Sequence, residues 1–131
     1  NEASGASAFA AADCGRIIYP QGLEGQIEGC IAMGLGYALS ERYEMDNGRP
    51  VTLTLTQAGI PTLKQMPEIQ EMVVQDPEPE GPFGANGFAE AGLLPTAPAI
   101  INAIYDAVGV RVMDLPATPE KVLDLLGKKK P

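Results

Sequence analysis

A glycine-rich segment, Gly81–Glu90, constrains this chain more than any other stretch of its sequence. It reads Gly-Pro-Phe-Gly-Ala-Asn-Gly-Phe-Ala-Glu, and its three glycines and one proline disfavour both a helix and a well-packed strand. Glycine also lets another object lie against bare peptide N–H groups. The segment ends in a single carboxylate, Glu90. If the turn buries this carboxylate, the burial would change its pKa. On spacing alone, an ordinary loop with a surface glutamate at a helix start is the preferred interpretation.

Composition predicts a globular chain that does not bind nucleic acid. A length of 131 residues suits one domain with a moderate core. The chain is 45% hydrophobic and 20% charged, which separates it from disordered proteins. Its net charge is −8, so the chain lacks the basic surface with which a protein replaces the counterions of nucleic acid. Residues 128–131, which contain the basic run Lys128–Lys130, are expected to form a solvated tail.

The residue types that are absent exclude several chemistries. The chain has no histidine, which removes the usual zinc sites and serine–histidine triads. Its two cysteines, Cys14 and Cys30, form no disulfide framework and cannot hold an iron–sulfur cluster. No run approaches the roughly 20 apolar residues of a membrane span, and no signal peptide opens the chain. We therefore expect a cytoplasmic protein without a membrane partner.

The longest predicted helix, Leu23–Met45, has an unusual number of glycines. Apolar residues recur four apart along it, as on one face of a helix. Glycine costs roughly 1 kcal/mol relative to alanine inside a helix, so several glycines suggest the close approach of another backbone or of a flat ligand. Gln26 lies among small residues near the start of this helix, and its amide can both donate and accept hydrogen bonds. Glu24 and Glu28 are expected on an exposed face.

The remaining patterns predict an α+β fold, with a small mixed sheet and helices packed mainly on one face. Residues 1–12 are expected to be a flexible N-terminal segment with a weak strand signal at its end. The expected strands are Cys14–Tyr19, the alternating Val51–Thr56, Ile69–Val74 and Val110–Met113, and the further expected helices are a buried Leu93–Val108 and Glu120–Leu126. Asp46-Asn47-Gly48 is typical of a turn, and the acidic, proline-rich Asp76–Glu80 is typical of a solvated connector.

Five motifs occur in the order and spacing of one enzyme family. Gly84–Glu90 resembles the Gly-Ala-x-Gly-x-Gly-Glu loop near the C-terminus of molybdenum hydroxylases, the xanthine dehydrogenase and aldehyde oxidoreductase family. Asp13–Pro20 is similar to its Asp-x-Gly-x-x-x-Asn-Pro segment, and Gly25–Gly29 matches its Gly-Gln-Ile-Glu-Gly helix. Pro98–Ile104 and Leu115–Glu120 resemble its closing motifs. Residues 13–127 are thereby identified as the C-terminal segment of a larger molybdopterin-binding domain.

The resemblance implies a function and a set of site residues. It implies hydroxylation of an aldehyde or an N-heterocycle with oxygen derived from water, with Glu90 as the general base. It places Gln26 against the molybdenum cofactor, and it lets the peptide N–H groups near Gly87 and Ala89 bind metal oxygens or the substrate. It also implies that most contacts to molybdopterin lie outside this chain.

The same resemblance implies partners. They are the remainder of the molybdopterin subunit, iron–sulfur and flavin (FAD) domains or subunits, and a small-molecule substrate. By itself the chain is expected to be an inactive fragment, or one subunit of a split enzyme.

Three departures from the family pattern support an alternative function. Tyr19 replaces an asparagine, Ala58 replaces an aromatic residue, and Ala89 replaces a glycine. A methyl group at Ala89 restricts positive φ angles and would move Glu90 if such an angle were needed. The alternative is a non-catalytic, acidic structural or interaction domain that retains the family fold.

Overall fold

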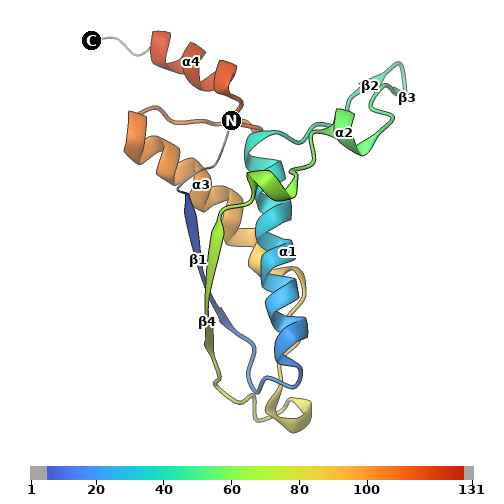
Figure 1. The fold of residues 1–131 in the computed structure, drawn as a ribbon, viewed down its shortest axis with the longest axis vertical. Helices are drawn as coiled ribbons and strands as arrows, with labels where there is room; N and C mark the ends of the chain where they lie inside the picture. The colour runs from blue at the N-terminus through green and yellow to red at the C-terminus, as the bar shows by residue number, and fades with distance from the viewer. Residues whose placement is uncertain (1–5, 129–131) are drawn as a thin grey trace. The chain divides into compact units, whose positions relative to one another are not determined.

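The computed structural model describes residues 6–128. Its helices and strands are β1 (Ser7–Asp13), α1 (Pro20–Leu39), β2 (Met45–Asp46), β3 (Arg49–Pro50), α2 (Leu55–Ala58), β4 (Glu68–Val74), α3 (Leu93–Val108) and α4 (Pro119–Lys128) (Figure 1). The chain divides into two compact units. The first contains the residues up to Ala32 together with Thr62–Leu94, and the second contains Met33–Pro61 together with the residues from Pro95 onward.

The first unit is built on a parallel pair of strands. β1 pairs with β4 in a register that runs from Ser7 opposite Glu68 to Asp13 opposite Val74. Alternate residues of each strand are partly buried, as expected where one face of a sheet packs on a core. The start of α1 packs on that face and contributes the buried side chains of Leu23, Ile27 and Ile31. The inward residues of β1 are alanines, which lets the helix approach closely.

Three expectations for the first unit need correction. Residues 7–12 belong to strand β1 rather than to a flexible segment, because β4 supplies a partner for them; residues 1–5 lie outside the described part. Cys14–Tyr19 is not a strand and forms a single bridge, from Gly15 to Ala85. Helix α1 begins at Pro20 rather than at Leu23, since proline is well suited to the first helical position.

The second unit contains close contacts at two glycines of the α1 sequence. A Cβ atom on Gly34 would lie 2.4 Å from Cβ of Thr96, and one on Gly36 would lie 3.0 Å from a ring carbon of Pro61. Ala38 is fully buried, and its carbonyl accepts a hydrogen bond of 2.6 Å from the Ala117 N–H. Packing against helix α3 therefore explains Gly34, and close contact with a loop explains Gly36.

Several boundaries in the second unit also differ from the expectation. α1 ends at Leu39 instead of Met45. The alternating Val51–Thr56 is not a strand, because the Thr54 hydroxyl and the Gln57 side chain form a capping box that starts α2. Val110–Met113 forms no strand, although Val110 and Val112 are buried. α4 continues through Gly127 to Lys128, and the rest of the expected tail, residues 129–131, lies outside the described part.

Other expectations for the second unit are confirmed. Asp46-Asn47-Gly48 turns between β2 and β3, with positive φ at Asn47 and Gly48. α3 has the predicted bounds, and Gly109 ends it with a φ of +65°. Its predicted burial is wrong, because none of its residues is buried within the described part of the chain.

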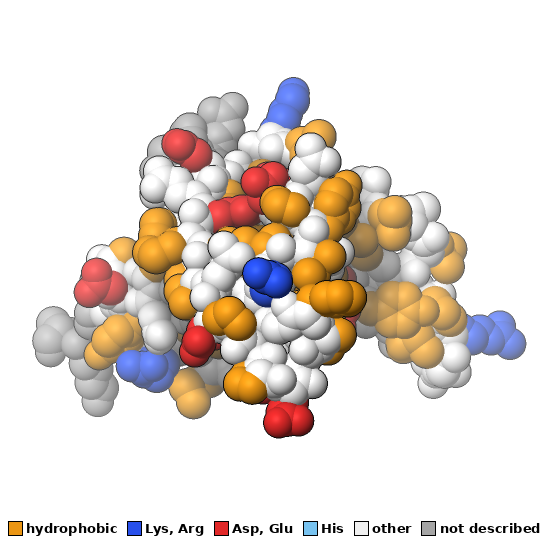
Figure 2. Space-filling model, turned by 90° about the horizontal axis from the view of Figure 1, so that it is seen from below, with side chains coloured by type: hydrophobic (Ala, Val, Ile, Leu, Met, Phe, Trp, Pro, Cys, Tyr) orange, Lys and Arg blue, Asp and Glu red, His pale blue; other side chains and the backbone are white. Residues whose placement is uncertain are grey.

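Large hydrophobic side chains are exposed in both units. In the face seen in Figure 2 they lie at the surface among acidic groups. Leu63, Phe83 and Met113 are 93%, 83% and 81% exposed. The expectation that no run approaches the length of a membrane span is wrong, because the stretch Glu90–Val108, with a mean hydropathy of 1.2, has the length and composition of one. One such stretch is a weak indication because core helices pass the same test, so the absence of a membrane partner stays a prediction.

Candidate functional site

Two loops about seventy residues apart are joined by backbone hydrogen bonds in the first unit. The Arg16 N–H donates to the Gly84 carbonyl over 2.8 Å, and the Asn86 N–H donates to the Cys14 carbonyl over 2.9 Å. Between them, Gly15 bridges to Ala85. The glycine-rich loop and the Asp13–Arg16 turn therefore form one structure.

Gly15 is required where these loops meet. Its φ is +62°, an angle that is costly for residues with a side chain. A Cβ atom there would lie 2.5 Å from the Gly84 carbonyl oxygen and 3.0 Å from the Asn86 nitrogen. The Asp13 carboxylate fixes the turn by accepting a 3.0 Å hydrogen bond from the Gly15 N–H.

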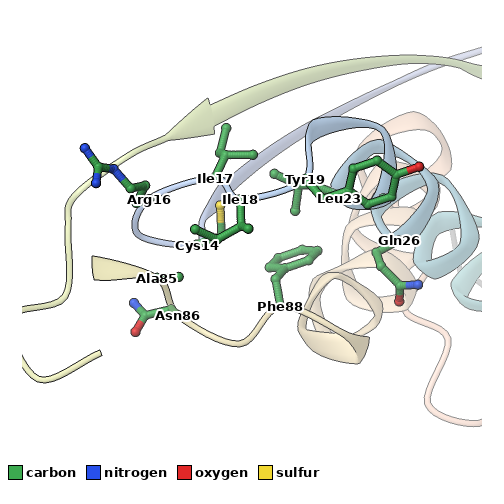
Figure 3. A pocket seen from close by; sticks show the side chains of 11 residues that line it. Cys14, Arg16, Ile17, Ile18, Tyr19, Leu23, Gln26, Ala85, Asn86 and Phe88 are labelled. Atoms are coloured by element: carbon green, nitrogen blue, oxygen red, sulfur yellow. The ribbon is translucent and has the colours of Figure 1, made fainter. Parts of the chain in front are cut away.

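A surface pocket of about 240 Å³ lies beside this junction. It is lined by Cys14, Arg16, Ile17, Ile18, Tyr19, Gly22, Leu23, Gln26, Ala85, Asn86 and Phe88 (Figure 3). These residues come from the turn after β1, from the first turns of α1 and from the glycine-rich loop. The pocket thus unites the three motifs that the sequence singles out in this half of the chain.

Glu90 lies two residues beyond Phe88, at the start of a short turn of 3-10 helix, Glu90–Gly92. Its side chain is exposed and has no hydrogen bond or ion pair within residues 6–128. The burial expected for this carboxylate is not seen within residues 6–128. The carboxylate is free to meet a group that the rest of a larger protein presents.

The predicted cofactor-side residues differ in how they are placed. Gln26 lines the pocket, with an exposed side chain. Gly87 and Ala89 are exposed loop residues outside the lining, and their peptide N–H groups have no hydrogen-bond partner within residues 6–128. Ala89 has a φ of −130°, so the positive φ that a methyl group would restrict does not occur at this position.

Sequence reasoning missed two contributors. Phe88, inside the quoted motif, is one of the residues that line the pocket (Figure 3). The available signal in the sequence was that Phe88 is a large aromatic residue among small ones. Cys30 is buried, and its thiol donates a hydrogen bond to the Ala89 carbonyl. Its position one helical turn after Gln26 was the available signal.

The donors of the pocket fit an anionic, hydrogen-bonding cofactor such as molybdopterin. The lining residues with nitrogen or oxygen in their side chains are Arg16, Tyr19, Gln26 and Asn86, and no carboxylate is among the residues that line the pocket. A cation and neutral amides favour an anion there. A Cβ atom on Gly87, Gly25 or Gly29 would meet nothing within 4 Å, so the space beside these backbones is open to a flat group. No cluster of three or more possible metal ligands occurs among residues 6–128.

Comparison with known proteins agrees with this chemistry. A family model described as a molybdopterin cofactor-binding domain matches residues 5–67. An aldehyde oxidoreductase of Megalodesulfovibrio gigas is 47% identical over 88% of this chain and 12% of its own length. One subunit of a probable xanthine dehydrogenase of Bacillus subtilis is 36% identical over 88% of this chain and 15% of its own length.

A solved structure extends the agreement to the fold. The quinoline 2-oxidoreductase of Pseudomonas putida 86 matches with a TM-score of 0.84 and 33% identity, over 94% of this chain and 16% of that chain. The chain is similar in sequence to part of the molybdopterin-binding subunits of aldehyde oxidoreductases and xanthine dehydrogenases. The α+β fold predicted from the sequence is that of one part of the large subunit in these molybdenum enzymes.

The chain spans about one-eighth of the length of the aldehyde oxidoreductase and about one-sixth of the length of the quinoline enzyme. The relatives are molybdopterin oxidoreductases, and this chain corresponds to a fragment of them. What the relatives act on is not carried over by this similarity.

Proposed function

We propose that this chain supplies one wall of the cofactor and substrate site in a molybdenum hydroxylase. The reaction is the hydroxylation of an aldehyde or an N-heterocycle with oxygen from water. The remainder of the molybdopterin subunit, iron–sulfur and FAD domains or subunits, and a small-molecule substrate complete the enzyme. The observation that supports this most is the hydrogen-bonded junction of the Asp13–Arg16 turn with the Gly84–Asn86 loop, because it gathers Gln26, Phe88 and the Glu90 turn in one unit.

Each of these residues has a separate task. Gln26 donates and accepts hydrogen bonds at the cofactor, and a neutral amide does so without changing the local charge. The free peptide N–H groups of Gly87 and Ala89 are donors for developing negative charge on oxygen. Molybdopterin, when bound, supplies the metal that takes up the two electrons of the oxidation.

Glu90 acts as the general base in this proposal. One of its carboxylate oxygens accepts the proton that the water-derived oxygen loses as it attacks the substrate carbon. A base must come within hydrogen-bond reach of that proton, and the exposed, unpaired side chain of Glu90 is available to do so. Phe88, in the pocket lining two residues earlier, excludes water from the same region.

The decisive variant is Glu90→Gln in the complete enzyme. The amide keeps the size of the side chain but cannot take a proton, so kcat is expected to fall roughly 10²- to 10⁴-fold. Molybdenum and pterin content, measured by metal analysis and by fluorescence of the released pterin, should not change. Near-normal turnover would exclude Glu90 as the base.

Metal analysis also separates this proposal from the alternative of a non-catalytic structural domain. An enzyme that contains this chain and carries molybdenum supports a role in the site. A complex purified without molybdenum, under conditions that load a related enzyme, would favour the structural domain.

A further inference from the structure

Cys30 connects the Gln26 helix to the turn that carries Glu90. Its side chain is 1% exposed, one of the two large side chains that are fully buried in the described chain. The thiol lies 3.2 Å from the Ala89 carbonyl oxygen and donates to it. Cys30 follows Gln26 by four residues, so both lie on the same face of α1, one turn apart.

The hydrogen bond acts on the peptide group that precedes Glu90. The Ala89 carbonyl, the Glu90 N–H and the Glu90 Cα belong to one planar unit, so holding the carbonyl oxygen also fixes where the Glu90 Cα lies. Because the Glu90 side chain has no partner of its own within residues 6–128, its position depends on this backbone.

Cys30 also limits the turn from its other end. A Cβ atom on Gly92 would lie 3.2 Å from Cβ and 3.5 Å from Sγ of Cys30. The turn therefore packs directly on the cysteine on both sides of Glu90, at the Ala89 carbonyl and at Gly92. A smaller side chain would leave a gap there, and a larger one would push the turn outward.

We propose that Cys30 is a positioning residue, whose buried thiol sets the place of the Glu90 carboxylate relative to Gln26. This inference rests on the proposed role of Glu90. The thiol takes no part in proton transfer. Its contribution is to hold the Glu90 carboxylate at a fixed distance from helix α1. A misplacement of a catalytic group by about 1 Å can cost on the order of 10²-fold in rate.

The test uses Cys30→Ala and Cys30→Ser in the complete enzyme. Alanine removes the donor and the bulk of the sulfur, and kcat is expected to fall about 10- to 100-fold with little change in KM or in molybdenum content. Serine keeps a donor and is expected to restore kcat to within about threefold of wild type. Ile31→Val, a loss of one methyl group from the adjacent core residue of the same helix, is the control for lost packing, and its kcat should stay at the wild-type value.

An infrared measurement gives a readout that does not depend on activity. A thiol that donates a hydrogen bond absorbs at a lower S–H stretching frequency than a free thiol. The difference spectrum of wild type minus Cys30→Ser should contain this lowered band. If Cys30→Ala yields no folded enzyme, the band and the kcat of Cys30→Ser decide the question without it.

Three results would overturn the inference. They are a Cys30→Ala enzyme with wild-type kcat, a Cys30→Ser enzyme that holds molybdenum but is as slow as Cys30→Ala, and an S–H band at the free-thiol frequency. The Glu90→Gln variant distinguishes an error in the proposed role of Cys30 from an error in the proposed role of Glu90. If Glu90→Gln is inactive while Cys30→Ala is normal, only the role of Cys30 is lost; if Glu90→Gln is active, the proposed base is wrong.

Discussion

At the scale of single residues, Gly15 determines whether the two loops of the candidate site stay together. Gly15→Ala forces a side chain into a φ of +62° and puts its methyl carbon 2.5 Å from a carbonyl oxygen of the partner loop. The left-handed conformation alone costs an L-residue roughly 1–2 kcal/mol, and the clash must separate the loops. In hydrogen–deuterium exchange of the complete enzyme, peptides covering residues 14–18 and 84–89 should therefore exchange faster.

Gly127→Ala is the matched control for this prediction. It adds the same methyl group within helix α4, where a Cβ atom meets nothing within 4 Å. Exchange of the two loop peptides should be unchanged by it. Wild-type exchange in Gly15→Ala would show that the junction does not depend on the glycine.

The candidate site residues that the sequence predicts lie within contiguous motifs. Gln26 and Glu90 belong to such motifs, but their surroundings depend on contacts between distant segments. The bond from Cys30 to Ala89 joins residues 59 positions apart, and no local pattern encodes it. The missing burial of Glu90 has the same origin, because whether a carboxylate is covered depends on chain that packs over it.

At the scale of elements, the Glu71 carboxylate on β4 is repelled by two glutamates of helix α1. The pKa of Glu71 is raised above its ordinary value of 4.5, mainly because burial disfavours the charge and further because Glu24 and Glu28 of α1 repel it. A carboxyl group whose pKa is raised by folding is destabilising when ionised. This cost is present above the raised pKa and disappears as the pH falls below 4.5.

Glu71→Gln should therefore stabilise the enzyme at neutral pH. The thermal midpoint of the variant is expected to exceed that of wild type at pH 7, and the difference should shrink as the pH is lowered and vanish below the ordinary pKa of 4.5. Glu68→Gln, on the same strand with an exposed side chain, is the control for simple loss of charge. A difference that is constant with pH, or that grows as the pH falls, would contradict the assignment.

Helices and strands were predictable where the spacing of apolar residues agreed with the residues that end each element. β4 and α3 have the expected positions because their apolar patterns end at turn residues. Val51–Thr56 alternates like a strand, but no strand pairs with it in the described chain, and the Thr54–Gln57 capping box decides the local structure. β1 is the opposite case: its alanines are a weak strand signal, and pairing with β4 makes it a strand.

At the scale of the whole molecule, the distribution of hydrophobic side chains separates a self-sufficient domain from a part of a larger one. Leu63, Leu94 and Met113 are 93%, 77% and 81% exposed, whereas isolated soluble domains rarely leave so many large apolar groups uncovered. The matched part of each relative is a minor share of its length. We propose that the remainder of the molybdopterin subunit covers these side chains.

This proposal predicts the behaviour of residues 1–131 expressed alone. Uncovered apolar surface attracts both itself and amphipathic dyes, so the isolated chain should enhance the fluorescence of anilinonaphthalene sulfonate, self-associate in sedimentation analysis and contain no molybdenum. The same sequence within the complete enzyme should show none of the dye binding. Replacing Leu63 and Met113 by glutamine should weaken self-association of the isolated chain, since each removes an apolar side chain from the surface without touching the buried core. A monodisperse isolated chain that does not bind the dye would mean that these side chains need no partner, and it would favour the independent structural domain over the fragment of an enzyme.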